Sequence, residues 1–337
     1  MEGGHNDFLV FYNDRPVAAG RRGGKLLTDD QLREYGLPRP NGPDTSGGSL
    51  NVSLVKATEA SYFALQVLLP LSRMRLYGFA VYIDNATAAT SELLIMPSAA
   101  QDRAVARRRI EFFSDSDSNG FGIEGADSWT CLMGLETYEN CWEGYAATVS
   151  RWLGADYHIE AWSGKGVVKN AISLFETSED PMPLYWPRAI ATDPASRWNF
   201  TLWLPDLVVI LLGTNDYYAW PYPSDEQFVD GYVRMVETVL AAYKSTTASG
   251  APLTVIALCG GTTENDRAPC PRVQQAVKRL LASPDKNVAR ARIAYVEIPT
   301  TLLAYPEDYG CLDHRNVVGQ RKLASYLLGQ VRPIMNW

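Results

Sequence analysis

The chain has 337 residues, of which 46% are hydrophobic and 20% are charged, so it can bury a full core and is not broadly disordered. Its formal net charge of −7 argues against nucleic acid or an anionic membrane as the main partner. No apolar run reaches the ~18 residues that a membrane span needs, and residues 1–24 show no apolar stretch typical of a secretory signal.

The chain falls into three parts along its length. Residues 1–49 are rich in Gly, Pro, Asp and Arg and show little periodicity, which predicts a loop-rich N-terminal extension. Residues 50–107 contain short β-like runs, such as 62–68 and 77–83, with no amphipathic helix between them. We therefore expect a small antiparallel β-sheet domain over 50–107, followed by a larger domain over 108–337.

In the larger domain, strand patterns alternate with helix patterns. Such alternation predicts an α/β fold with a parallel sheet that is covered on both faces, and ligand sites in such sheets lie at the carboxyl ends of the strands. Strands are expected over 110–113, 157–162, 207–212, 253–258 and 293–298, and helices over 144–153, 226–243, 272–281 and 320–331.

Three polar residues lie at positions where a serine esterase needs them. Ser116 follows the first predicted strand, in a turn where a serine can be either a nucleophile or a helix cap. Asn215 follows a later strand, where its amide can donate to an oxyanion or can simply form a turn. Of the three histidines, His5 lies in the loop-rich part and His158 inside a predicted strand, which leaves His314 as the candidate base.

Four segments resemble, in order, the four sequence blocks of the SGNH (GDSL-type) hydrolases. They are 114–120 (SDSDSNG), 161–170 (AWSGKGVVKN), 213–216 (GTND) and 313–314 (DH). The second block, together with 182–185 (MPLY), is most similar to the second family of carbohydrate esterases, which includes acetylxylan esterases and bifunctional cellulase-esterases. The resemblance implies a flavodoxin-like three-layer α/β/α hydrolase domain preceded by an antiparallel, jelly-roll-like β-sandwich. It also implies removal of acetyl groups from sugar hydroxyls.

The resemblance also implies roles for individual residues. Ser116 would be the nucleophile and, through its own N–H, one donor of the oxyanion hole. The backbone of Gly166 would be the second donor, with Gly164 as the alternative if the alignment slips. Asn215 would be the third donor, and His314 would be the general base.

Two residues in the first block depart from the pattern of this family. Ser114 stands where a glycine is usual, and its side chain can crowd the turn before the nucleophile. Asp117 stands where Ile or Leu is usual, so a carboxylate lies either near the site or at the cap of the next helix. Both changes raise the chance of low or lost activity.

The acid that usually orients the histidine is also missing from its usual places. Those positions are Cys311 and Leu312, whereas Asp313 is directly adjacent to His314. Adjacent side chains of an extended backbone point apart, so Asp313 can orient the ring only if the loop is tightly bent. We therefore expect a Ser–His dyad, with His314 Nδ1 on a backbone carbonyl within 310–313 and Nε2 on Ser116.

The five cysteines show no spacing typical of a metal site, so the sequence predicts neither a metal nor another cofactor. Two close pairs, Cys131–Cys141 and Cys259–Cys270, are expected to lie within disulfide reach, which leaves Cys311 over. Disulfides would fit a secreted protein and the family resemblance, whereas buried thiols would fit a cytosolic one.

The expected function is that of a metal-independent serine esterase that releases acetate from acetylated xylan or another carbohydrate through an acyl-enzyme on Ser116. Aromatic platforms for sugar are expected among Tyr185, Tyr217, Tyr218 and Trp220. Two alternatives stay open: an SGNH esterase or lipase for lipid, aryl or small-molecule esters, and an inactive carbohydrate-binding relative. We expect no nucleic-acid partner and no membrane span, and a monomer is compatible with the sequence.

Overall fold

The computed structural model describes residues 108–337 apart from 127–130, 132–137, 190 and 192, together with four strands near the N-terminus. These are β1 (Asn6–Tyr12), β2 (Arg15–Pro16), β3 (Lys25–Thr28) and β4 (Val52–Lys56), and β1 pairs antiparallel with each of the other three.

This small sheet differs from the predicted loop-rich extension. Strands β1, β2 and β3 all lie within residues 1–49, and the apolar and aromatic composition of β1 favours a strand. Because β4 pairs with β1, the sheet also crosses the predicted boundary between residues 49 and 50. The predicted strands over 62–68 and 77–83 lie outside the described residues, so the β-sandwich over 50–107 stays a prediction.

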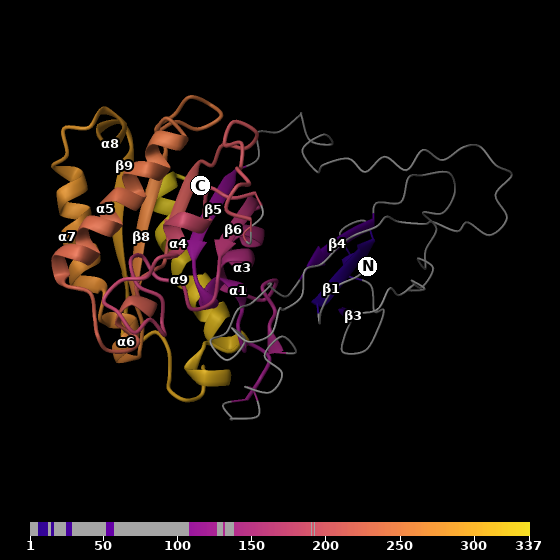
Figure 1. Ribbon diagram of the computed structural model, residues 1–337. Coiled ribbons are helices and arrows are strands. Elements are labelled where there is room, and N and C mark those ends of the chain that lie inside the picture. Colours follow the sequence, from indigo (N-terminus) through magenta and orange to yellow (C-terminus); the bar gives the residue numbers. More distant parts are fainter. Residues whose placement is uncertain are drawn as a thin grey trace, which may run out of the picture.

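A parallel sheet forms the centre of the larger domain (Figure 1). In the described part of the chain, its strands are β5 (Arg109–Ser114), β6 (Asp156–Ala161), β7 (Leu207–Ile210), β8 (Thr254–Gly260) and β9 (Arg292–Ile298). Their order is β6-β5-β7-β8-β9, and each pair of neighbours is parallel. This is the flavodoxin-like strand order, and all five predicted strands are confirmed.

Helices cover both faces of the sheet, as predicted. On one face, α3 (Tyr145–Trp152) and α9 (Val317–Met335) pack with β-strand side chains such as Phe112. On the other face, α5 (Asp225–Ala242) and α7 (Cys270–Leu281) form the second apolar cluster. The shorter helices are α1 (Ser116–Asn119), α4 (Met182–Tyr185), α6 (Glu264–Arg267) and α8 (Lys286–Arg290), and two 3₁₀ turns cover Asn215–Tyr217 and Cys311–Asp313.

The helix ends follow the chemistry of their sequences. Ser224 and Gln227 form a capping box at the start of α5, and Asn316 accepts two backbone N–H groups at the start of α9. Gly154 has φ 62° just after α3, as its position after the predicted helix suggested. None of the helices in the described part is long and apolar enough to cross a membrane.

The strand order places a ligand site between β5 and β7. The chain runs from β5 outward to β6 and then returns past β5 to β7, so the direction of winding reverses between these two neighbours. Ligands bind at the carboxyl ends of strands at such a point. Ser116 lies just beyond the end of β5, and Asn215 lies just beyond the end of β7.

Candidate active site

Ser116 is the first residue of α1, and a tight turn presents its hydroxyl at the sheet edge. Asp115 caps this short helix by accepting a hydrogen bond from the N–H of Asp117 at 3.2 Å. Gly120 ends it with φ 68°, where an added Cβ would lie 2.3 Å from the carbonyl oxygen of Asn140. The turn is therefore closely packed on both sides, and Ser116 keeps only 8% of its surface exposed.

His314 lies beside Ser116, although 198 residues separate them in the sequence. Its Nε2 is 2.7 Å from Ser116 Oγ, and its Nδ1 is 2.9 Å from the carbonyl oxygen of Leu312. Because a carbonyl can only accept, Nδ1 carries the proton and Nε2 is free to accept one from the serine. Both contacts predicted for this ring are confirmed.

The loop before His314 bends sharply to make this contact. Leu312 has φ 50° and ψ 47°, and Asp313 has φ 57°. A left-handed conformation costs a non-glycine residue roughly 1–2 kcal/mol, so two in succession are an unfavourable local arrangement that the surroundings must stabilise. The bend turns the Leu312 carbonyl back toward the imidazole.

Asp313 does not orient the ring despite this bend. Its carboxylate accepts a hydrogen bond from the hydroxyl of Tyr305 at 2.8 Å. The geometry of the histidine is therefore that of a dyad held by a backbone carbonyl.

The second sequence block forms a loop whose backbone is hydrogen-bonded to the side chain of Asp216. This buried carboxylate accepts hydrogen bonds from the backbone N–H groups of Val167, Val168 and Lys169 at 2.8–2.9 Å. Gly166 fits closely against it, since an added Cβ would lie 2.3 Å from Asp216 Oδ2. Any larger residue at this position would displace the loop.

Asn215 joins the nucleophile turn to the second-block loop. Its Nδ2 donates to Asp115 Oδ2 and to the carbonyl oxygen of Lys165, each at 2.9 Å. Both amide protons are therefore engaged, and a third acceptor must share one of them. Burial, and then the charge of Asp117, raise the pKa of Asp115 well above its usual range.

Asp117, which departs from the family pattern, has a buried cationic partner. Its carboxylate forms an ion pair with Arg315, whose second terminal nitrogen is 3.3 Å from Asp266. Burial raises the pKa of Asp266, and the charge of Arg315 opposes this rise. Arg315 is adjacent to His314, so this network ties the nucleophile turn and helix α6 to the histidine loop.

One of the two predicted disulfides is present and the other is replaced. Cys259 and Cys270 are bonded with a Cα separation of 5.5 Å, as predicted. Cys131 bonds to Cys311 rather than to Cys141, with a Cα separation of 5.7 Å, so the predicted Cys131–Cys141 pair is wrong. Cys131 and Cys311 are separated by 180 positions in the sequence, so their proximity could not be inferred from spacing, and the bond anchors the start of the histidine loop.

The four aromatic candidates divide into two kinds. Tyr217 is buried against Phe228, and the hydroxyl of half-buried Tyr185 donates to Asp180. Tyr218 and Trp220 are 59% and 81% exposed. Residues 217–220 form an aromatic loop. The buried side chain of Lys169 donates to the carbonyl of Ala219 and so holds this aromatic loop against the second block. Neither Lys169 nor Arg315 was predicted.

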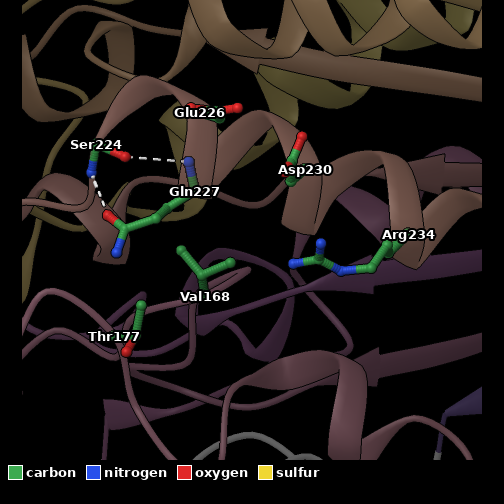
Figure 2. A pocket seen from close by; sticks show the side chains of 7 residues that line it. All are labelled: Val168, Thr177, Ser224, Glu226, Gln227, Asp230 and Arg234. Atoms are coloured by element: carbon green, nitrogen blue, oxygen red, sulfur yellow. Dashed lines mark hydrogen bonds between the residues drawn. The ribbon is translucent and has the colours of Figure 1, made fainter.

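A separate polar cavity of about 300 Å³ lies beside the start of α5 (Figure 2). The residues that line it are Val168, Thr177, Ser224, Glu226, Gln227, Asp230 and Arg234. The lining includes neither Ser116 nor His314, so this cavity is distinct from the serine–histidine site.

The chain is similar in sequence to known esterases over part of its length. The chain is 34% identical over 138 residues to the cellulase/esterase CelE of Acetivibrio thermocellus, a match that covers 40% of this chain and 16% of that protein. It is 25% identical over 138 residues to an acetylxylan esterase / glucomannan deacetylase of Cellvibrio japonicus, a match that covers 40% of this chain and 36% of that protein. The chain thus matches only a minor part of the length of either relative.

Solved structures share the fold. A family two carbohydrate esterase from Clostridium thermocellum, in complex with cellohexaose, superimposes with a TM-score of 0.72 at 22% identity and covers 100% of this chain and 88% of that one. The acetyl xylan esterase Est2A from the rumen bacterium Butyrivibrio proteoclasticus gives 0.69 at 14% identity, with 100% and 86% coverage. Residues 127–321, a range that includes Asn215 and His314, match the GDSL-like Lipase/Acylhydrolase family. The chain belongs to this family, and its α/β domain has the SGNH hydrolase fold.

Proposed function

We propose that the protein is a serine esterase that removes acetyl groups from carbohydrate, with Ser116 as nucleophile and His314 as general base. The observation that carries the proposal is the 2.7 Å contact between Ser116 Oγ and His314 Nε2, in a ring whose other nitrogen is fixed on the Leu312 carbonyl. A positioned base next to a hydroxyl is what a serine nucleophile requires.

The reaction proceeds in two steps. Ser116 Oγ attacks the acetyl carbonyl carbon while His314 Nε2 takes the hydroxyl proton. His314 then returns the proton to the sugar oxygen, the ester bond breaks, and the acetyl group stays on Ser116. In the second step His314 removes a proton from water, which attacks the acyl-enzyme, and acetate leaves as Ser116 regains its proton. The Leu312 carbonyl stabilises the imidazolium through Nδ1–H in both steps.

Three donors are proposed for the oxyanion. The N–H of Ser116 lies at the start of α1, where backbone N–H groups have no partner inside the helix. Within the described part of the chain, the N–H of Gly166 makes only a long contact of 3.4 Å with Asn170 Oδ1, which leaves it available, and Gly164 is the alternative. Asn215 Nδ2 is the third donor. Its N–H that is hydrogen-bonded to Asp115 would also donate to the oxyanion, in a hydrogen bond shared between the two acceptors.

The substrate class rests on the relatives and on the aromatic loop. The relatives named above are a cellulase/esterase and acetylxylan esterases. Exposed aromatic rings such as Tyr218 and Trp220 provide flat apolar faces on which a sugar ring can pack. Together they favour an acetylated polysaccharide over a lipid ester.

The direct test measures hydrolysis of 4-nitrophenyl acetate and acetate release from acetylated xylan by the purified full chain. We expect both activities. Long-chain 4-nitrophenyl esters are measured in the same assay, and faster hydrolysis of these than of 4-nitrophenyl acetate would support the lipase alternative. Binding of xylan without hydrolysis of either substrate would support the inactive, carbohydrate-binding alternative.

Replacing Trp220 with alanine is expected to impair hydrolysis of acetylated xylan but not of 4-nitrophenyl acetate. Loss of an aromatic packing partner of this kind is worth about 0.5–1.5 kcal/mol, so KM for acetylated xylan should rise roughly two- to tenfold. The rate on 4-nitrophenyl acetate should be unchanged. Trp152→Ala is the matched control because Trp152 is exposed on α3. Equal effects of the two variants on xylan would remove Trp220 from the substrate site.

Replacing Asp313 with asparagine is expected to lower kcat/KM by less than about tenfold. Its carboxylate contacts Tyr305 and not the imidazole, whereas removal of the acid of a true triad costs roughly 10⁴-fold. His314→Ala, measured in the same assay, sets the scale of a full loss of the base. A drop of the larger size in Asp313→Asn would show that the loop rearranges to form a triad during catalysis.

The N-terminal part is proposed to be an antiparallel β-sandwich domain in front of the hydrolase domain, and the protein is proposed to be a monomer. The antiparallel pairing of β1 with β2, β3 and β4 supports the first point. Size-exclusion chromatography with light scattering tests the second.

A further inference from the structure

Three side chains with metal-binding groups meet on one face of the central sheet. Glu111 lies in the middle of β5 and is paired in register with His158 on β6, and Glu160 follows two residues later on the same face of β6. One ligand atom from each of the three lies within 4.8 Å of the others. Two carboxylate oxygens and one imidazole nitrogen are thus close enough to bind the same ion.

The most buried of these side chains has an unsatisfied oxygen. Glu111 is only 2% exposed, and among the described residues its Oε2 has no hydrogen-bond partner. Tyr243 Oη and Trp186 Nε1 lie near this carboxylate and favour its charged form, but the opposing effect of burial is larger. The charged form is therefore costly without a cation, and the carboxylate faces His158 and Glu160. The buried, unsatisfied Oε2 is a second observation, beside the clustering, that points to a cation.

The surroundings fix the orientation of the imidazole. The His158 ring stacks on Trp203 with 3.9 Å between ring centroids, which holds its plane. His158 and Glu160 are both partly exposed, which provides a route for an ion from solvent.

We propose that Glu111, His158 and Glu160 bind one divalent transition-metal ion of the Mn²⁺ or Zn²⁺ type. The imidazole suits Zn²⁺ and the two carboxylates suit Mn²⁺, whereas Mg²⁺ and Ca²⁺ prefer sites made of oxygen alone. Three protein ligands leave at least one position for water. The ion would link the edge strand β6 to β5. Because Glu111 lies within β5 and Ser116 lies beyond its end, the ion would brace the sheet and take no part in ester cleavage.

The alternative is that the two carboxyl groups are simply neutral. Burial raises the pKa of Glu111 to about 8 and that of Glu160 to about 7, so without a cation both groups hold protons over part of the neutral range. In that case the cluster needs no ion and would show no specific affinity for one.

Calorimetric titration of the full chain, stripped with EDTA and dialysed at pH 7.5, distinguishes these cases. MnCl₂ and ZnCl₂ are expected to bind with one ion per chain, and MgCl₂ and CaCl₂ at least tenfold more weakly. Glu160→Gln is expected to weaken Mn²⁺ binding at least tenfold. Losing even an outer partner of a metal ligand weakens metal binding by roughly tenfold or more, and Glu160 is proposed as a direct ligand. Glu111→Gln is a second, isosteric variant in case the first does not fold, as judged by circular dichroism.

Glu297→Gln is the matched control because Glu297 is an exposed glutamate on β9, the opposite edge strand. It should bind Mn²⁺ like the wild type. Absence of saturable Mn²⁺ and Zn²⁺ binding would overturn the proposal, as would equal Mn²⁺ affinity in the wild type, Glu160→Gln and Glu111→Gln. Electron paramagnetic resonance of bound Mn²⁺ in the wild type, with loss of the bound signal in Glu160→Gln, provides an independent readout.

Discussion

Replacing Ser116 with alanine is expected to abolish ester hydrolysis. The hydroxyl is the group that His314 Nε2 contacts at 2.7 Å, and alanine removes the atom that would carry the acetyl group. In a well-studied serine protease, loss of the nucleophile lowers kcat by about 10⁶-fold. We expect a fall in kcat on 4-nitrophenyl acetate to the limit of detection, with the circular dichroism spectrum unchanged.

Ser118→Ala is the matched control for this experiment. Ser118 lies in the same short helix, but its hydroxyl contacts Tyr145 Oη at 3.0 Å, away from the histidine. It should keep kcat within about tenfold of the wild type, since a lost neutral hydrogen bond is worth about 0.5–1.5 kcal/mol. If Ser116→Ala also stayed within tenfold, Ser116 could not be the nucleophile and the proposed mechanism would fail.

Much of this fold could be predicted because its signals are local. The five strands are short apolar runs, and the helices between them have clear ends such as Gly154. Parallel strands place their carboxyl ends along one edge, so Ser116 and Asn215 had to lie near each other once the strands were placed. The dyad followed from counting residues around His314, since neither Cys311 nor Leu312 can act as an acid.

The contacts that could not be predicted join residues far apart in the chain. The partner of Cys131 is 180 residues away, while Cys141 was the nearer choice along the sequence. The proposed metal ligands come from adjacent strands, whereas the spacings typical of metal sites place the ligands close together along the chain. The compensation of Asp117 by Arg315 likewise depends on which loops meet, and hydrophobic periodicity carries no information about that.

Replacing Arg315 with methionine is expected to destabilise the protein strongly. The change removes the partner of two buried carboxylates, Asp117 and Asp266, and leaves both charges uncompensated. Breaking a buried ion pair in this way costs about 3–5 kcal/mol. Urea unfolding at pH 7.5 should show a loss of this size. Arg321→Met is the control, because Arg321 is exposed on α9 and its ion pair with Glu143 lies at the surface. That variant should lose at most about 1 kcal/mol.

The pH dependence shows whether this loss is electrostatic. Without Arg315 the pKa of Asp266, which burial already raises, rises further, because the cation that favours its charged form is gone. Protonation then removes this buried charge, so the deficit of Arg315→Met is largest near pH 7.5 and shrinks as the pH falls toward 4.5. Adding Asp117→Leu, the type of residue usual in the family, should recover part of the loss at pH 7.5 by removing one orphaned carboxylate. A deficit that is the same at both pH values, and that Asp117→Leu does not reduce, would mean that Arg315 contributes packing rather than charge. The histidine loop would then be held in place by the Cys131–Cys311 bond and its apolar surroundings, without the ion-pair network.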